Sequence, residues 1–86
     1  MHDFPYALTN HARRVIAERE ISMEWIARII SNPQKTESDP ENAELVHALG
    51  RIAERSEKVL RVIYNKTATP PRIVTAYFDR TQKGKL

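Results

Sequence analysis

Residues 72–78, Arg-Ile-Val-Thr-Ala-Tyr-Phe, form the segment that most limits what this chain can fold into. The segment is rich in β-branched and aromatic residues, which favour a β-strand. Apolar side chains occupy both of its alternating faces, a pattern typical of a central strand or of a strand that helices cover. The rest of the sequence must therefore supply neighbouring strands and a helical layer.

Two further segments are candidates for the neighbouring strands. Residues 59–64 are strongly β-branched and predict a strand. Residues 44–54 are ambiguous, because their apolar side chains recur at helical spacing, whereas Gly50 and a hairpin loop at 55–57 favour a strand. The predicted strands span residues 44–54, 58–66 and 72–79.

A helical hairpin precedes these strands. The first helix has an N-cap residue at Thr9 or Asn10 and an apolar stripe over residues 12–16. The second follows an N-cap at Ser22 and ends before Pro33, because the residue before a proline disfavours the α region. The predicted helices span residues 10–19 and 23–31.

The order of these elements predicts an α+β fold. Residues 33–42 are polar and contain two prolines, so we interpret them as a loop between the helices and the sheet. The helical hairpin is the only element available to cover the sheet. We therefore expect an N-terminal helical hairpin packed on an antiparallel sheet of about three strands. With 86 residues there is no room for a second core, so we expect one domain over residues 1–86.

Charge is distributed unevenly along the chain. Residues 1–42 carry a net charge of −2, and residues 43–86 carry +5. This asymmetry suggests a polyanionic partner such as nucleic acid, although a basic surface can also serve solubility alone. The chain has no cysteine, no long apolar run and no signal-peptide layout at its N-terminus, so we expect no membrane span and a cytoplasmic location.

Strong catalytic motifs are absent from the sequence. Gly50 and Gly84 are the only glycines, which excludes a glycine-rich phosphate loop. His2, His11 and His47 are scattered and do not form a metal-binding helix motif. We therefore expect no cofactor and no metal ion.

The remaining candidates for chemistry are basic and aromatic side chains. A metal-free ribonuclease needs a base for the ribose 2′-hydroxyl, a cation for the charged phosphorane and an acid for the leaving oxygen. Histidine, arginine and tyrosine are suitable residue types for these roles. We predict His11, Arg61, Tyr77 and Arg80 as catalytic residues, and Arg13, Arg14, Arg51, Lys58 and Arg72 as nucleic-acid-binding residues.

Each candidate also has a structural interpretation. His11 can simply begin a helix, and Tyr77 can be a core aromatic residue with its hydroxyl at the rim. The strand arginines can form an ordinary solvated sheet face, and Asp79 with Arg80 can form a local ion pair. The sequence does not show that the candidates converge. Trp25 is expected in the core, between the second helix and the sheet.

Three stretches of the chain resemble a known family. They are His11-Ala12-Arg13 continuing to Glu18-Arg19 and Ile21-Ser22, then Asn32-Pro33, and finally residues 59–62 together with 73–80. These stretches resemble the bacterial domain-of-unknown-function family 4258, which looks related to the RelE/ParE-like plasmid-stabilisation toxins. The similarity extends from Leu8 to Arg80 and implies a RelE-like fold, with two helices packed on an antiparallel sheet.

The resemblance also implies a function. RelE-like toxins cleave messenger RNA, often at the ribosome, ParE-like relatives inhibit DNA gyrase, and an antitoxin usually neutralises both. By this resemblance we expect a toxin-like protein of a toxin–antitoxin system, acting as a metal-independent endoribonuclease on mRNA, with RNA and a cognate antitoxin as partners. The alternative is a non-catalytic binding module, such as a ParE-like inhibitor, a nucleic-acid-binding domain or a degenerate toxin relative.

The chain departs from the family pattern at two positions. Val15 stands where a basic residue is expected, which removes one phosphate contact. Glu20 stands where a glycine usually separates the two helices. A residue other than glycine has a steric cost at this turn if the turn needs a positive φ.

Overall fold

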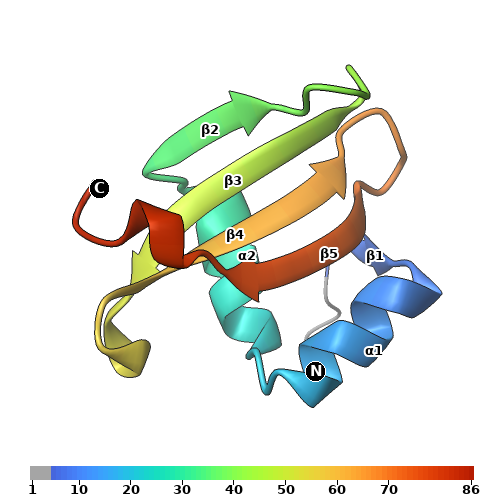
Figure 1. Cartoon of the computed structure of the whole chain (residues 1–86). Coiled ribbons are helices and arrows are strands. Elements are labelled where there is room, and N and C mark those ends of the chain that lie inside the picture. Colours follow the sequence, from blue (N-terminus) through green and yellow to red (C-terminus); the bar gives the residue numbers. More distant parts are fainter. Residues whose placement is uncertain (1–4) are drawn as a thin grey trace.

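The computed structural model describes residues 5–86, which form a five-stranded mixed sheet with two helices packed on one face (Figure 1). The strand order is β1-β5-β4-β3-β2; β1 and β5 are parallel and all other neighbours are antiparallel. No helix in this part of the chain is long and apolar enough to cross a membrane. The elements are β1 (Ala7–Leu8), α1 (Asn10–Glu18), α2 (Met23–Ser31), β2 (Lys35–Ser38), β3 (Leu45–Ile52), β4 (Lys58–Asn65) and β5 (Arg72–Phe78), with 3₁₀ turns η1 (Ala53–Arg55) and η2 (Arg80–Gln82).

The α+β class agrees with the sequence analysis, but the expected antiparallel sheet of about three strands is wrong. Strand β2 lies inside the segment 33–42 that we interpreted as a loop, and it pairs antiparallel with β3. Strand β1 pairs parallel with the first residues of β5, so the sheet is mixed. Neither strand has the alternating apolar pattern that predicts a β-strand. Strand β1 has only two residues, and β2 is Lys-Thr-Glu-Ser, without an apolar side chain.

The main core lies between the two helices and the sheet. Helix α2 approaches β3 closely at Gly50, where an added Cβ would lie 2.5 Å from Cδ1 of Ile29. A glycine at this position therefore allows the helix to pack against the strand. The buried core residues are Ala12, Ile16, Ile21, Ile26 and Ile29 from the helical part, and Ala48, Ile52, Leu60, Val62, Ile73 and Ala76 from the strands.

The face of the sheet opposite the helices is also partly covered. Leu49 and Val59 alternate with core residues along their strands and so belong to this opposite face. Their exposed fractions are nevertheless only 0% and 1%. Turn η2 lies across this face (Figure 1). The C-terminal segment therefore adds a small second layer to the sheet.

The turn between the two helices has the positive φ that a glycine would adopt without strain. Glu20 has φ 54°, in the left-handed region. The Glu20 N–H donates to the Ala17 carbonyl and the Ile21 N–H to the Ile16 carbonyl, which together form a Schellman motif. Glu20 therefore adopts a left-handed conformation in which its Cβ has a steric cost that a glycine would avoid.

Replacing Glu20 with glycine should raise the free energy of unfolding by about 0.5–1 kcal/mol, because glycine adopts the left-handed region without a Cβ clash. Urea denaturation followed by circular dichroism measures this difference. Glu18→Gly is the matched control inside α1, and it should lower stability by about 1 kcal/mol. A Glu20→Gly variant less stable than the wild type would contradict the assignment of strain to this turn.

Candidate functional site

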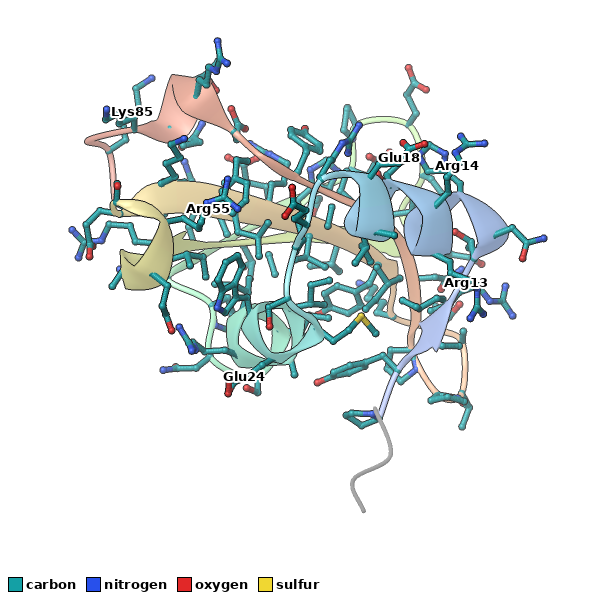
Figure 2. All side chains as sticks on the ribbon, turned by 90° about the horizontal axis from the view of Figure 1, so that it is seen from below. Arg13, Arg14, Glu18, Glu24, Arg55 and Lys85 are labelled. Carbon is teal, nitrogen blue, oxygen red and sulfur yellow. The ribbon has the colours of Figure 1, made fainter. Side chains whose placement is uncertain are left out.

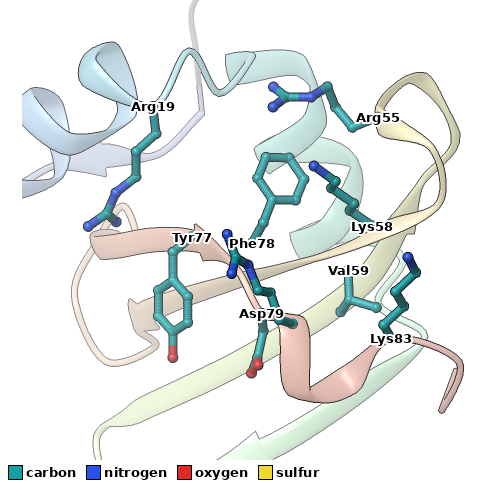
Figure 3. Close-up of a pocket in the computed structure, with 9 residues that line it drawn as sticks. Arg19, Arg55, Lys58, Val59, Tyr77, Phe78, Asp79 and Lys83 are labelled. Atoms are coloured by element: carbon teal, nitrogen blue, oxygen red, sulfur yellow. The ribbon is translucent and has the colours of Figure 1, made fainter.

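A pocket of about 760 Å³ lies at the C-terminal end of β5 (Figure 3). Five of its lining side chains are cationic, whereas Asp79 is the one acidic side chain among them. The electrostatic potential of such a concavity attracts anions. The cations are Arg19, Arg55, Lys58, Arg80 and Lys83, and the other lining residues are Val59, Tyr77, Phe78 and Asp79.

The antiparallel β4–β5 pairing brings the β3–β4 hairpin, the start of β4 and the end of β5 together at this pocket. Leu60 is the register partner of Phe78, so the start of β4 lies beside the end of β5. The β3–β4 hairpin closes tightly, with Ser56 and Glu57 both in the left-handed region at φ 59° and 62°. The hairpin therefore presents its basic side chains beside those of η2, which follows β5 directly.

Arg19 closes one side of the pocket along the edge of the sheet. Its Nη1 donates a hydrogen bond of 2.8 Å to the carbonyl oxygen of Ala76. Strand β1 pairs only with Arg72 and Ile73, so the later residues of β5 have no strand on this side. Arg19 therefore satisfies an edge carbonyl and adds a positive charge at the pocket wall.

The negative charge of Asp79 is already compensated within the protein. Its Oδ1 accepts hydrogen bonds from the Thr81 hydroxyl (2.6 Å) and the Thr81 N–H (3.0 Å). Its Oδ2 accepts a 2.8 Å bond from Nε of Arg61. The hydrogen bond from the Thr81 hydroxyl, with that from Arg61, lowers the pKa of the Asp79 carboxyl below its ordinary value of 3.8. The pocket consequently keeps its positive character.

Arg61 is the centre of a buried ionic network on the sheet face opposite the helices. Its exposed fraction is 7%, and its Nη1 donates to Oε1 of Glu37 (2.9 Å) and to Nδ1 of His47 (2.7 Å). Burial lowers the pKa of Arg61, but the hydrogen bonds to Glu37 and Asp79 outweigh it, so the pKa lies above its ordinary value. Arg61 therefore stays charged and ties β4 to β2, β3 and the turn after β5.

The network also determines the tautomer of His47. A guanidinium group can only donate, so Nδ1 of His47 must accept from Arg61. Nε2 of His47 then carries the proton and donates to Oδ1 of Asp39 at 2.7 Å. The hydrogen bond from His47 lowers the pKa of Asp39. His47 is thus held between the Arg61 guanidinium and the Asp39 carboxylate, with both ring nitrogens hydrogen-bonded.

The pocket brings together three of the residues predicted from the sequence, namely Lys58, Tyr77 and Arg80. Arg61 does not line the pocket, but it adjoins two residues that do, since it donates to Asp79 and is the register partner of Tyr77. Its Nε and Nη1 donors are engaged by protein groups, so these two atoms are not available to a ligand, and the catalytic role of Arg61 stays a prediction.

The other predicted residues lie elsewhere. His11 is exposed on α1, with Nδ1 3.3 Å from the Arg14 guanidinium, and it does not line the pocket. Arg13 and Arg14 project from α1, well apart from Arg55 (Figure 2). Arg51 pairs with Glu57 at 3.8 Å, and Arg72 begins β5, at the opposite end from the pocket. In residues 5–86 no three His, Asp or Glu side chains gather as metal ligands would.

Sequence reasoning did not assign a site role to Arg19, Arg55 or Lys83. Arg55 was part of a hairpin loop and Lys83 part of a basic tail in that interpretation. The sequence position of Arg55 and Lys83 could have indicated a shared site. Both follow or precede a predicted strand, and antiparallel pairing of 58–66 with 72–79 brings those two strand ends together.

Replacing Arg61 with methionine should lower the free energy of unfolding by about 3 kcal/mol at neutral pH, because Asp79 and Glu37 lose their buried cation. The folded-state pKa values of both carboxyls are lowered, so their contribution is present above the ordinary values of 3.8 and 4.5. It is lost as the pH falls through the lowered values, and the difference between variant and wild type should shrink there. Urea denaturation at a series of pH values measures it.

Arg51→Met is the matched control, because Arg51 pairs with Glu57 in an exposed contact of 3.8 Å. It should change stability by less than about 0.5 kcal/mol. An Arg61→Met variant as stable as the control at neutral pH would show that the network does not hold the fold.

Comparison with curated proteins and with solved structures gives no significant match. One family model, described as "Domain of unknown function (DUF4258)", matches residues 8–78. The matched region contains Arg19, Arg55, Lys58 and Tyr77, and it ends before η2. Because the match covers most of the chain, this protein belongs to the DUF4258 family of domains of unknown function.

Proposed function

We propose that this chain is an RNA-binding protein of the toxin type, which holds backbone phosphates in the basic pocket at the end of β5. The observation that carries the proposal is the set of cations without partners at this pocket. In residues 5–86 the side chains of Lys58, Arg80 and Lys83 make no hydrogen bond or ion pair with the protein. Phosphate oxygens would supply the missing acceptors and relieve the repulsion between these cations.

The composition of the pocket favours a nucleic acid over a small anion. Tyr77, Phe78 and the Arg55 guanidinium provide flat surfaces beside the cations, a combination typical of single-strand binding sites. The basic second half of the chain supports the same partner class. The resemblance to RelE-like toxins supports RNA as the polyanion and a cognate antitoxin as the protein partner.

Cleavage of the bound RNA is the second candidate function, and Tyr77 is the observation that favours it. The Tyr77 side chain lines the pocket on the other side of β5 from Arg55 and Lys58 (Figure 3), and its hydroxyl has no hydrogen-bond partner in residues 5–86. The tyrosine hydroxyl would donate its proton to the leaving 5′-oxygen while solvent water takes the proton of the attacking 2′-hydroxyl, and the cations of the pocket would stabilise the charged phosphorane. His11 takes no part in this proposal, because it lies outside the pocket.

Lys58→Ala and Arg80→Ala should each weaken binding of a labelled oligoribonucleotide by about tenfold, because each removes a charge-assisted phosphate contact. Fluorescence anisotropy measures the dissociation constant over a range of salt concentrations. Each variant should also reduce the slope of log K against log salt by about 0.7. Arg13→Ala removes the same charge from exposed α1 and should leave the affinity almost unchanged.

Equal losses in Arg13→Ala and in the pocket variants would indicate diffuse attraction and contradict the assignment of the pocket. The same samples, separated on a denaturing gel, test the second candidate. Tyr77→Phe should abolish cleavage while leaving binding in place. Wild-type protein that binds RNA and leaves it intact would contradict the cleavage candidate and support RNA binding alone.

A further inference from the structure

Arg55 is held over an aromatic platform at the edge of the pocket. Its Cζ lies 5.0 Å from the centroid of the Phe78 ring and 5.9 Å from that of Trp25. The two rings meet edge to face, with centroids 6.3 Å apart and an interplanar angle of 70°. Cation–π attraction to both rings therefore fixes a side chain that a hairpin turn would otherwise leave mobile.

The guanidinium of Arg55 has no polar partner in the protein. Within residues 5–86 it makes no hydrogen bond and no ion pair. The acidic side chains near it in sequence are engaged elsewhere, since Glu54 pairs with Arg28 at 3.0 Å and Glu57 lies 3.8 Å from Arg51. All of its N–H donors, and the part of its plane that borders the pocket, are therefore available to a ligand.

Arg55 and Lys58 lie together on one side of the pocket (Figure 3). Arg55 projects over Phe78, and Tyr77 points to the other side of the strand (Figure 3). Successive residues of a strand face opposite sides, which explains the separation. The Arg55 guanidinium and the Tyr77 hydroxyl therefore lie on opposite sides of β5, although both residues line the pocket.

We infer that the pocket takes single-stranded nucleic acid, with an unpaired nucleobase stacked on the Arg55 guanidinium and the adjoining phosphate bound by Lys58 and Arg80. This inference rests on the proposed RNA-binding function and names its substrate class. Nucleobases stack on arginine planes as they do on aromatic rings. In a duplex both faces of each base are covered by its neighbours, so this contact selects an unpaired nucleotide. The pocket volume of about 760 Å³ is within the usual range for small-ligand sites.

The test compares three ligands of equal length, namely an oligoribonucleotide, its abasic ribose-phosphate chain and its duplex. The wild type should bind the single strand about fivefold or more tighter than the abasic chain, because stacking adds to the phosphate contacts. The duplex should bind more weakly than the single strand. Trp25 is the sole tryptophan and lies 5.9 Å from Arg55, so its intrinsic fluorescence should change with the single strand and not with the abasic chain.

Arg55→Lys keeps the charge and removes the plane, so it should reduce the affinity for the single strand to that for the abasic chain. Arg28→Lys is the same change at an exposed position of α2 outside the pocket, and it should leave both affinities unchanged.

The wild-type comparison does not depend on how any variant folds. Equal wild-type affinity for the base-bearing and abasic chains, or for the duplex and the single strand, overturns base stacking while RNA binding stands. Absence of binding to all three ligands overturns the proposed function and this inference together.

Discussion

The hydrogen-bonded ion pair between Arg61 and Asp79 is the contact on which the arrangement at the end of β5 depends. Nε and Oδ2 are 2.8 Å apart, and the exposed fractions of the two residues are 7% and 9%. Breaking a buried pair by removing one partner costs several kcal/mol, about 3–5 in measured cases. The other oxygen of Asp79 caps η2 through Thr81, so the same carboxylate determines where the chain turns after the last strand. Arg80 and Lys83 reach the pocket from that turn.

The two helices and strands β4 and β5 have clear sequence patterns, whereas β3 is ambiguous and the edge strands have none. Ser22 is the N-cap of α2, as its residue type suggests, and Thr9 is the N-cap of α1. The ambiguous segment around Gly50 is a strand because it pairs along its whole length with β4. Strand β2 has no apolar side chain, and its pairing with β3 is a long-range contact that local propensity does not encode.

The site was only partly predictable for a similar reason. Charge asymmetry predicts a basic surface, but strand register decides which basic residues share a pocket. Arg51, Arg61 and Arg72 look equivalent in the sequence, yet Arg51 is exposed, Arg61 is buried in an ionic network and Arg72 lies at the other end of β5 from the pocket. Their roles follow from burial and from the carboxylates that face them, which the sequence alone does not show.

We propose that RNA contacts this chain through the pocket at the end of β5. Titration of the ¹⁵N-labelled protein with a short oligoribonucleotide, followed by amide NMR spectra, tests it most directly. We expect the largest shifts on residues 55–59 and 77–83, which include most of the lining residues. Shifts concentrated on Arg13 and Arg14 of α1, or at Arg72, with those two segments unchanged, would contradict it.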